Sequence, residues 1–589
     1  MKAFRMPSTV AWWFMAALCA YAATENVVAT IQPEPDGVAQ LRNALEAIRT
    51  NNTDMQGDII IEIADGTLSI DTPFLLDESC SGANGHNVIF RAASGAKPVI
   101  SRGTRIENWT EDEHGRWRAP LNGKRVRQLF VNDVRAQRAR GPFPEGAERY
   151  GNLKAIDADA GFIVPNGEMA QWRNPSEIVF GFFNSWSHMT CDVAAIAADP
   201  DGRARVRMRM PAFMLMSRKE GVRAEMPAYI ENAIEVLDEP GEWYADASTG
   251  AVYYMPRAGE DMTSASAVIT GNDELLHIGG RSDERAHHIR FEGITFAEAA
   301  ANDPDTGGHA DVQANFVITT ENSYERDGYL VNLHNEYIKP RAAIVVGAAS
   351  DIVFDGCTFT RIGGAALNLD AAQKASDVAT QDVTIRNCTF FDIGGSAIQV
   401  GDVNRYAHHP LDDEHVVRNI RIENCRIHNI GSEYEDSVAV FAGYVQKVEI
   451  IGNEMHDLPY SGISIGWGWG EEDAGGSTYP IPYIYESPTP ASDNRIANNH
   501  IYRVMQKRLD GGGIYTLGNQ PGTIIEGNHI HDNKGWPGGI YLDEGSGFIE
   551  VRNNRVYNVP TPMNFNNRNQ DRIETCNVHD NDFAEPQAK

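Results

Sequence analysis

The stretch Asp382-Val-Thr-Ile-Arg-Asn-Cys-Thr-Phe-Phe-Asp-Ile-Gly returns one unit later as Asn419-Ile-Arg-Ile-Glu-Asn-Cys-Arg-Ile-His-Asn-Ile-Gly. Further copies begin at Asp351, Lys447, Asn494, Thr523, Phe548 and, in degraded form, Glu574. Their apolar residues alternate with period two, which indicates strands rather than helices. A short repeated unit cannot bury its apolar face alone and must stack on its own copies. The sequence therefore predicts an all-β fold, a right-handed parallel β-helix.

Aligning the copies gives a column of small residues spaced 22 to 46 residues apart: Cys357, Cys388, Cys425, Asn453, Asn499, Asn528, Asn554 and Cys576. Coils stacked at about 4.8 Å place each member over the previous one, so we expect the buried amides to form a hydrogen-bond ladder. A second strand in each coil gives an inward column, namely Leu367, Ile398, Ala439, Ile463, Ile514, Ile540 and Met563. Its neighbours point outward and form a plausible sugar-binding face: Asn368, Gln399, Ser464, Tyr515, Tyr541 and Asn564.

A further column contains rings: Phe391, His428, His456, Tyr502, His531, Tyr557 and His579. We interpret it as a ladder of stacked rings along one wall rather than a metal site or a general base at His456 or His531. The next column is rich in Asp and Asn, which favour turns. The sequence therefore predicts no metal site and no cofactor.

Residues 1–22 have a basic start, an apolar run and a small-residue end, which is typical of a secretory signal peptide. Cys19 lacks Leu three residues before it, which favours signal-peptidase cleavage over a lipid anchor. No later segment approaches about 18 continuous apolar residues. We expect a periplasmic or extracellular protein with no membrane attachment after signal removal.

Removal of the signal leaves six cysteines, an even number that invites a disulfide interpretation in an exported protein. Three of them share one interior column, where small thiols pack well, so free thiols are favoured there. The state of Cys80 and Cys191 stays open.

The formal charge of −30 comes from 81 acidic and 51 basic residues without long acidic blocks. It argues against nucleic acid as a partner, because nucleic acid binding requires clustered Lys and Arg. It argues more weakly against a strongly anionic polysaccharide, since a local basic groove could override the net field.

The repeats also indicate the domain organisation. Residues 23–104 form an N-terminal cap and first coils, because the helical pattern from Asp36 to Arg49 would close the open end of the rod. Over 105–265 the repeat disappears and hairpin-like alternation predicts an inserted antiparallel β domain. Residues 266–589 form the main β-helix, which carries the active-site face.

Two long excursions, residues 401–418 and 466–493, leave the ends of outward-facing strands. Long loops in compact domains are often functional, and we expect these to wall a groove. Trp467 and Trp469 in the second loop could stack on sugar rings, or could simply anchor the loop.

Carboxylates stand beside glycines in two consecutive coils, as Asp510-Gly-Gly-Gly-Ile-Tyr and Gly538-Gly-Ile-Tyr-Leu-Asp-Glu. Glycosidic bond cleavage needs one protonated and one ionised carboxyl group, which makes Asp510, Asp543 and Glu544 the catalytic candidates. Alternatively, Asp510 and Asp543 cap turns. An extended strand would separate these two by roughly 20 Å or more. Therefore the glycines fold the chain back, the register is wrong, or Glu544 pairs with another acid.

These segments, with Arg127-Gln-Leu-Phe-Val-Asn-Asp and Glu231-Asn-Ala-Ile-Glu-Val-Leu-Asp, resemble exported β-helix glycosidases of the glycoside hydrolase family 141 type. The resemblance covers nearly the whole mature chain. It implies an α-L-fucosidase or a xylanase acting on plant cell-wall polysaccharides, with two catalytic aspartates that fit Asp510 and Asp543. Substrate identity does not transfer safely with a fold.

The favoured hypothesis is a monomeric glycoside hydrolase for plant or algal saccharides, most similar to an α-L-fucosidase, with Tyr515 and Tyr541 beside Trp467 and Trp469 as sugar contacts. A xylanase or xylosidase is an alternative within the same class. A polysaccharide lyase would need a base and a cation, for which Lys507, Arg508 and Arg568 are nearby in sequence. A non-catalytic carbohydrate-binding solenoid is the remaining alternative.

Overall fold

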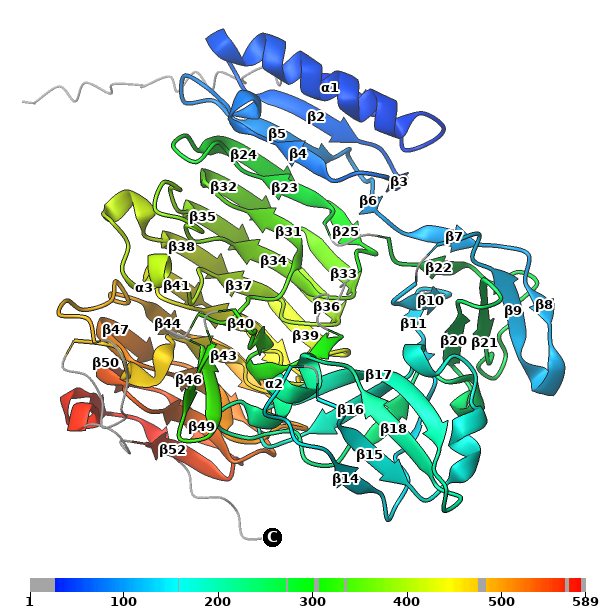
Figure 1. Ribbon diagram of the computed structural model, residues 1–589. Helices are drawn as coiled ribbons and strands as arrows, with labels where there is room; N and C mark the ends of the chain where they lie inside the picture. The colour runs from blue at the N-terminus through cyan, green and yellow to red at the C-terminus, as the bar shows by residue number, and fades with distance from the viewer. Residues whose placement is uncertain are drawn as a thin grey trace, which may run out of the picture.

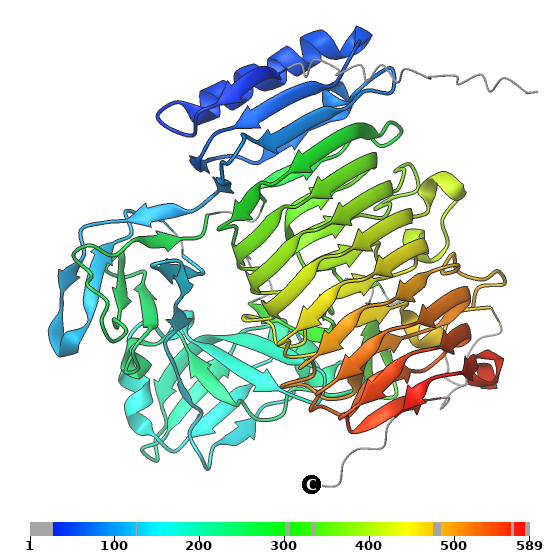
Figure 2. The same ribbon diagram turned by 180° about the vertical axis from the view of Figure 1, so that it is seen from behind.

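The computed structural model describes residues 27–583 except 125, 157, 272–273, 301–306, 322, 333–335, 475–483 and 567–570. The predicted signal peptide, residues 1–22, lies outside this part of the chain. Most of the described residues form a rod of stacked coils, with a second, antiparallel part beside it (Figures 1 and 2). The predicted fold class, a parallel β-helix with a capping helix and an antiparallel insertion, is confirmed.

Three parallel sheets run along the rod. Sheet A has, in order, β1 (Val27–Ile31), β2 (Ile59–Ile63), β5 (Val88–Ala92), β24 (Ala286–Glu292), β32 (Ala349–Asp355), β35 (Gln381–Arg386), β38 (Arg418–Glu423), β41 (Gln446–Ile451), β44 (Arg495–Ala497), β47 (Asn519–Glu526), β50 (Gly547–Arg552) and β53 (Asn577–His579). Sheet B has β3 (Gly66–Ser69), β6 (Pro98–Ser101), β25 (Thr295–Ala297), β33 (Thr358–Ile362), β36 (Thr389–Ile393), β39 (Arg426–Ile430), β42 (Glu454–His456), β45 (His500–Tyr502), β48 (His529–His531), β51 (Arg555–Tyr557) and β54 (Asp582–Phe583). Sheet C, which carries the site, has β4 (Phe74–Leu76), β23 (Leu276–Ile278), β31 (Ala342–Val346), β34 (Ala365–Leu369), β37 (Ile398–Val400), β40 (Val440–Ala442), β43 (Ile463–Ile465), β46 (Gly511–Thr516), β49 (Pro537–Leu542) and β52 (Thr561–Phe565).

Helix α1 (Gly37–Asn51) lies across the N-terminal end of the rod (Figure 1). Its apolar residues Leu41, Ala44 and Ile48 are buried against the first coils. The helix therefore covers the apolar end of the solenoid, as predicted.

The insertion leaves the rod after β6 and returns at β23. One of its sheets is β11 (Val134–Arg135), β10 (Leu129–Val131), β22 (Ala267–Ile269) and β7 (Thr104–Ile106). The second is β12 (Gln137–Arg138), β20 (Glu242–Asp246), β21 (Ala251–Tyr254), β9 (Trp117–Pro120) and β8 (Thr110–Glu111). The third has β13 (Arg140–Pro142), β19 (Tyr229–Glu231), β16 (Val179–Phe183), β17 (His188–Ala198), β18 (Ala204–Met208), β15 (Gly161–Val164) and β14 (Glu148–Tyr150), with β26 (Gly308–His309) paired to β17.

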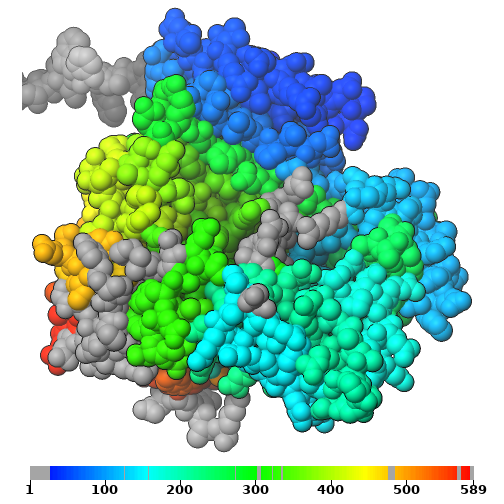
Figure 3. Space-filling view, in the orientation of Figure 1, coloured from blue at the N-terminus to red at the C-terminus, as the bar shows by residue number. Residues whose placement is uncertain are grey.

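Several shorter elements lie where the insertion meets the rod. Helix α2 (Ala212–Arg218) belongs to the insertion, and all but its last two residues are buried. Strands β27 (Asp311–Gln313) and β28 (Phe316–Val317), and the hairpin of β29 (Ser323–Arg326) and β30 (Tyr329–Asn332), come from the rod between β25 and β31. Figure 3 shows this segment, in bright green, beside the insertion on the face seen in Figure 1. Sheet C is therefore covered over part of its length. A short helix, α3 (Arg405–His408), lies in the first long excursion.

The predicted amide ladder is present in the interior. The side-chain N–H of Asn453 donates to Asn499 Oδ1 at 3.0 Å, and the same pattern continues to Asn528 and Asn554 at 2.9 Å each. The next member is Asn581, also at 2.9 Å, and not the predicted Cys576. The degraded last copy obscured this register: Val551 pairs with Val578, which places Asn581 and not Cys576 after Asn554.

The same shift affects the ring column. Phe391, His428, His456, Tyr502, His531 and Tyr557 pair in register and stack with centroids 4.9 to 5.6 Å apart. His579 lies instead on β53 of sheet A, so its placement in this column was wrong. In the inward column of sheet C, Val440 and not Ala439 pairs with Ile398 and Ile463.

The six cysteines of the described chain are all free. Five are buried and Cys576 is partly exposed. The Cys357, Cys388 and Cys425 thiols each donate weakly to a backbone carbonyl inside the rod, at 3.2 to 3.7 Å. Free thiols in this column were predicted from packing and are confirmed.

We expect Asn499→Ala to lower the free energy of unfolding by about 1–3 kcal/mol, because it removes the acceptor of the buried Asn453 backbone N–H and the side-chain donor to the Ile450 carbonyl. Urea denaturation followed by circular dichroism measures this. Asn577→Ala, at an exposed position of β53, is the control and is expected to change stability by less than about 0.5 kcal/mol. Equal losses in the two variants would contradict a stabilising ladder.

Candidate active site

The predicted acids lie at the ends of two neighbouring strands of sheet C. Asp510 immediately precedes β46, and Asp543 immediately follows β49. Strands β46 and β49 pair in parallel, with Ile514 opposite Ile540 as predicted. Asp510, Asp543 and Glu544 all line one cavity of about 530 Å³. The structure therefore brings the three acids to one cavity, although Asp510 lies at the N-terminal end of its strand and Asp543 at the C-terminal end of the neighbouring strand.

One possibility from the sequence was that the three glycines after Asp510 fold the chain back. They do not. Residues Gly511–Thr516 form a continuous buried strand. A Cβ on Gly511 would meet Ser461 Oγ at 2.4 Å, and one on Gly512 would meet the Gly539 carbonyl oxygen at 2.5 Å. The glycines are therefore required for close stacking of coils, and the bend lies at Asp510 itself, whose φ is +59°.

The surroundings of the two aspartates differ. Asp543 is 7% exposed and accepts hydrogen bonds from the Tyr515 hydroxyl and from Asn566 Nδ2, the latter at 2.7 Å. Burial raises the pKa of Asp543 above its ordinary value, and these donors, together with the Tyr541 hydroxyl, oppose that rise. Donors of this kind favour the ionised carboxylate.

Asp510 has fewer donors. Burial, followed by the nearby negative charge of Asp543, raises its pKa to about 6, and only the Tyr541 hydroxyl acts in the other direction. Two interacting carboxyl groups titrate as a pair, and the proton resides on the member with fewer donors. At pH values below about 6, Asp510 is therefore the member of the pair that is expected to hold the proton.

Of the four predicted sugar contacts, Tyr515 and Trp469 line the cavity. Tyr541 is not part of the wall that the described residues form; its ring packs on Tyr515 with centroids 5.3 Å apart, and its hydroxyl acts on both aspartates. Trp467 is fully buried and packs on Phe316 at 4.9 Å. It anchors the loop, and the prediction that it contacts sugar is wrong.

Much of the wall was missed from the sequence, because it comes from segments far from the repeats. The insertion contributes Trp186, Lys219 and Glu220, and the segment between β25 and β31 contributes Tyr329 and Tyr337 among others. No motif marks these residues. Their only sequence signal is that they stand in the two stretches where the repeat is interrupted.

Arg326, at the end of β29, holds three parts of the wall together. Its guanidinium contacts Glu471 of the 466–493 loop at 3.1 Å and also pairs with Glu220 of the insertion. Arg326 is 6% exposed and Glu471 is also 6% exposed. Glu220 and Glu471 line the cavity, so this ion-pair network fixes its shape.

Lys219 also lines the cavity, and its charge interacts with a second pair of acids. Burial lowers its pKa to about 8, against the attraction of Asp311 and Asp436. These two carboxyl groups are fully buried and bonded to each other, and burial raises the pKa of Asp436 far above its usual value. The arrangement therefore favours a proton on Asp436 over one on Asp311.

Two clusters of described residues have the composition of metal ligands. His309, Asp311 and Asp436 are one, and all three are buried. His500, His529 and His531 are the other, on sheet B outside the cavity.

Comparisons with known proteins agree with this architecture. The profile of the GH141 insertion domain matches residues 118–257, and that of the right-handed β-helix region matches residues 404–556. A solved structure titled a glycoside hydrolase is 26% identical, with a TM-score of 0.76 over 94% of this chain and 95% of that chain. The protein is a glycoside hydrolase of the family 141 type.

Other solved structures are less similar to this family 141-type hydrolase. A complex of XylC with xylose is 12% identical, with a TM-score of 0.42 over 87% of this chain and 65% of that chain. A family 136 lacto-N-biosidase from Eubacterium ramulus is 8% identical, with a TM-score of 0.38 over 94% of this chain and 67% of that chain. No curated protein matches the sequence significantly.

We expect Arg326→Met to lower kcat/KM at least about tenfold, mainly through KM, because removing one partner leaves Glu220 and Glu471 as uncompensated acids in the wall. Steady-state kinetics on a cleaved glycoside measures this. Arg218→Met is the control. It removes the ion pair from Arg218 to Glu325, which lies in the same hairpin as Arg326, and should change stability by less than about 1 kcal/mol. An unchanged KM in Arg326→Met would contradict a role for this network in the cavity.

Proposed function

We propose that this hydrolase removes a terminal α-L-fucosyl or closely related unit from plant or algal saccharides. Asp510 is the proposed general acid, and Asp543 the proposed base or nucleophile. The observation that carries this assignment is the difference in donors between the two: burial raises the pKa of both, to about 6 for Asp510, but three side-chain donors oppose the rise at Asp543. Such a difference between paired carboxyl groups is the signature of acid and base roles.

The proposed reaction uses one proton from Asp510 and one molecule of water. Asp510 protonates the glycosidic oxygen while its bond to the anomeric carbon breaks. Asp543 either attacks that carbon, to be displaced later by water, or removes a proton from a water molecule that attacks directly. In both cases water supplies the new hydroxyl group and Asp510 regains a proton. Glu544, which lies beside Asp543 and accepts from Asn566 Nδ2 at 3.4 Å, is proposed to contact the sugar.

Several features support action on a terminal unit. The wall comes from the insertion, the segment between β25 and β31 and the 466–493 loop, so it encloses the acids on several sides. Trp469 and Tyr515 supply aromatic surface, and the acids supply hydrogen-bond acceptors for sugar hydroxyls. The choice of a fucosyl unit rests on the family resemblance alone, and a xylose-directed activity is the alternative within the class.

A lyase is less well supported. It would need a cation beside a uronate carboxylate, but Lys507 and Arg508 both pair with Glu435, at 2.6 and 3.1 Å. Arg568 lies outside the described residues. The cavity wall carries six acids against Lys219, which disfavours an anionic sugar. The non-catalytic alternative gives the raised pKa of Asp510 no role.

We also propose that the enzyme is exported and acts as a monomer. The proposal of export rests on residues 1–22. No helix in the described ranges is long and apolar enough to span a membrane. Fractionation of expressing cells and size-exclusion chromatography would test the two points.

We expect Asp510→Asn and Asp543→Asn to separate the two roles. Loss of a general acid costs about 10²–10⁴-fold on a substrate with a poor leaving group. It costs much less on an aryl glycoside with an acidic phenol, which leaves without protonation. Asp543→Asn should abolish turnover of both substrates.

Steady-state kinetics on an aryl and an alkyl glycoside of the same sugar measures this difference. The aryl substrate is first chosen by screening chromogenic glycosides. Asp327→Asn is the control, because Asp327 lines the cavity from an exposed turn and should retain activity within a few fold. Full activity of both Asp510→Asn and Asp543→Asn would exclude the assignment, whereas activity on another sugar alone would exclude only the fucosyl specificity.

The pH dependence follows from the same pair. Activity should fall as pH rises above about 6, because Asp510 loses the proton that it must donate. The free energy of unfolding should also decrease as pH rises, because burial favours the neutral acid. The stabilising contribution of Asp510 is present at low pH and is lost as pH rises through about 6.

Asp510→Asn should therefore raise Tm relative to the wild type at pH 8 more than at pH 5, as scanning calorimetry can measure. A pH-independent difference in Tm would contradict the raised pKa.

A further inference from the structure

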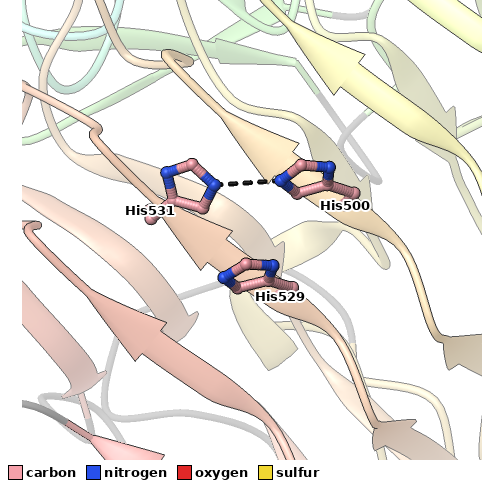
Figure 4. Close-up of side chains that lie close together, drawn as sticks. All are labelled: His500, His529 and His531. Carbon is pink, nitrogen blue, oxygen red and sulfur yellow. Dashed lines mark hydrogen bonds between the residues drawn. The ribbon is translucent and has the colours of Figure 1, made fainter.

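Three histidines meet on the outer surface of sheet B, away from the cavity. His500 begins β45, and His529 and His531 are the first and last residues of β48 in the next coil. All three are partly buried, and their potential ligand atoms lie within 4.8 Å of one another. In Figure 4 an edge of the His500 ring is turned toward an edge of the His531 ring. Their Nε2 atoms lie 2.9 Å apart.

Ring stacking explains only part of this arrangement. His500 stacks on His529 with centroids 4.9 Å apart, and His531 stacks between Tyr502 and Tyr557 in the ring column. The contact between His500 Nε2 and His531 Nε2 crosses diagonally between the two stacks. It brings together edges of rings rather than faces, so stacking does not require it.

The tautomer of His531 directs a lone pair into this cluster. Its Nδ1 lies 2.8 Å from Asp532 Oδ2, where an N–H can donate to the carboxylate. With the proton on Nδ1, the Nε2 atom is an acceptor and faces His500. Metal-binding histidines have the same arrangement, in which a carboxylate orients the ring through the distal nitrogen.

We propose that His500, His529 and His531 bind one Zn²⁺-class transition metal ion, with Asp532 as a positioning residue. Three imidazoles select zinc or a neighbouring transition metal over calcium or magnesium, which prefer oxygen ligands. With metal–nitrogen distances of about 2.0–2.1 Å, a tetrahedral site needs nitrogens about 3.3 Å apart. Small ring rotations bring the present separations to that value. A water molecule would complete the coordination.

Such an ion would cross-link the two coils that carry the proposed catalytic acids. The chain runs from β45 to Asp510 and β46, and from β48 to β49 and Asp543. The site is nevertheless on a different sheet from the cavity, so the proposal does not rest on the glycosidase mechanism. It concerns stability and the register of the two coils.

Zinc binding to untagged, chelator-treated full-length protein tests the proposal, by competition with a chromogenic zinc chelator. We expect one ion per chain and a higher Tm with zinc than without. His500→Ala and His531→Ala should each weaken binding by at least about 100-fold, and Asp532→Asn by about 10–100-fold. His428→Ala is the matched control, because His428 belongs to the same ring column but is not in the cluster.

Circular dichroism must show that each variant is folded, and His500→Gln and His531→Gln replace any alanine variant that is not. The cobalt-substituted protein gives a second readout, a visible absorption band of tetrahedral Co²⁺ that the histidine variants should lose. The proposal is overturned if the wild type binds no zinc, if its Tm does not respond, or if His428→Ala weakens binding as much as the cluster variants.

Discussion

The stacking of each coil on the next is the constraint on which the rest of the structure depends. Parallel strand pairing fixes residues of successive coils about 4.8 Å apart. The buried amides from Asn453 to Asn581 fix the register, because each side chain accepts from one neighbour and donates to the next. A slip of one residue would turn every inward side chain toward solvent. The rod is therefore rigid, and any two residues on adjacent coils have a defined separation.

A uniform rod offers no enclosed site, because its surface is a series of nearly identical steps. The cavity exists only where the repeat is interrupted, by the insertion, the segment between β25 and β31 and the 466–493 loop. These segments meet at Arg326, whose partners Glu220 and Glu471 come from the other two. The coils therefore position the acids, and the interrupting segments enclose and shape the space around them.

Period-two alternation was sufficient to predict the fold and the pairing of Ile514 with Ile540, and helical spacing predicted the capping helix, because these depend on local pattern. Carboxylates beside glycines in consecutive coils were sufficient to select acids that share one cavity. Sequence pattern failed where the repeat is degraded, as at Asn581, and where a residue's role depends on distant partners. Trp467 packs against Phe316, more than a hundred positions earlier, and the glycines after Asp510 face backbone and side-chain atoms of neighbouring coils. Neither contact leaves a mark in the local sequence.

The asymmetry between Asp510 and Asp543 follows from the same stacking. Outward side chains of sheet C lie above one another, so Tyr515 and Tyr541 stand side by side and supply hydroxyl groups at the Asp543 end of their strands. At the other end the strand begins with three glycines, which have no side chains to donate. Asp510 is therefore partly buried with a single donor, and burial together with the charge of Asp543 raises its pKa to about 6. The glycines contribute indirectly, because they place no side-chain donors at the start of β46 that would oppose this rise.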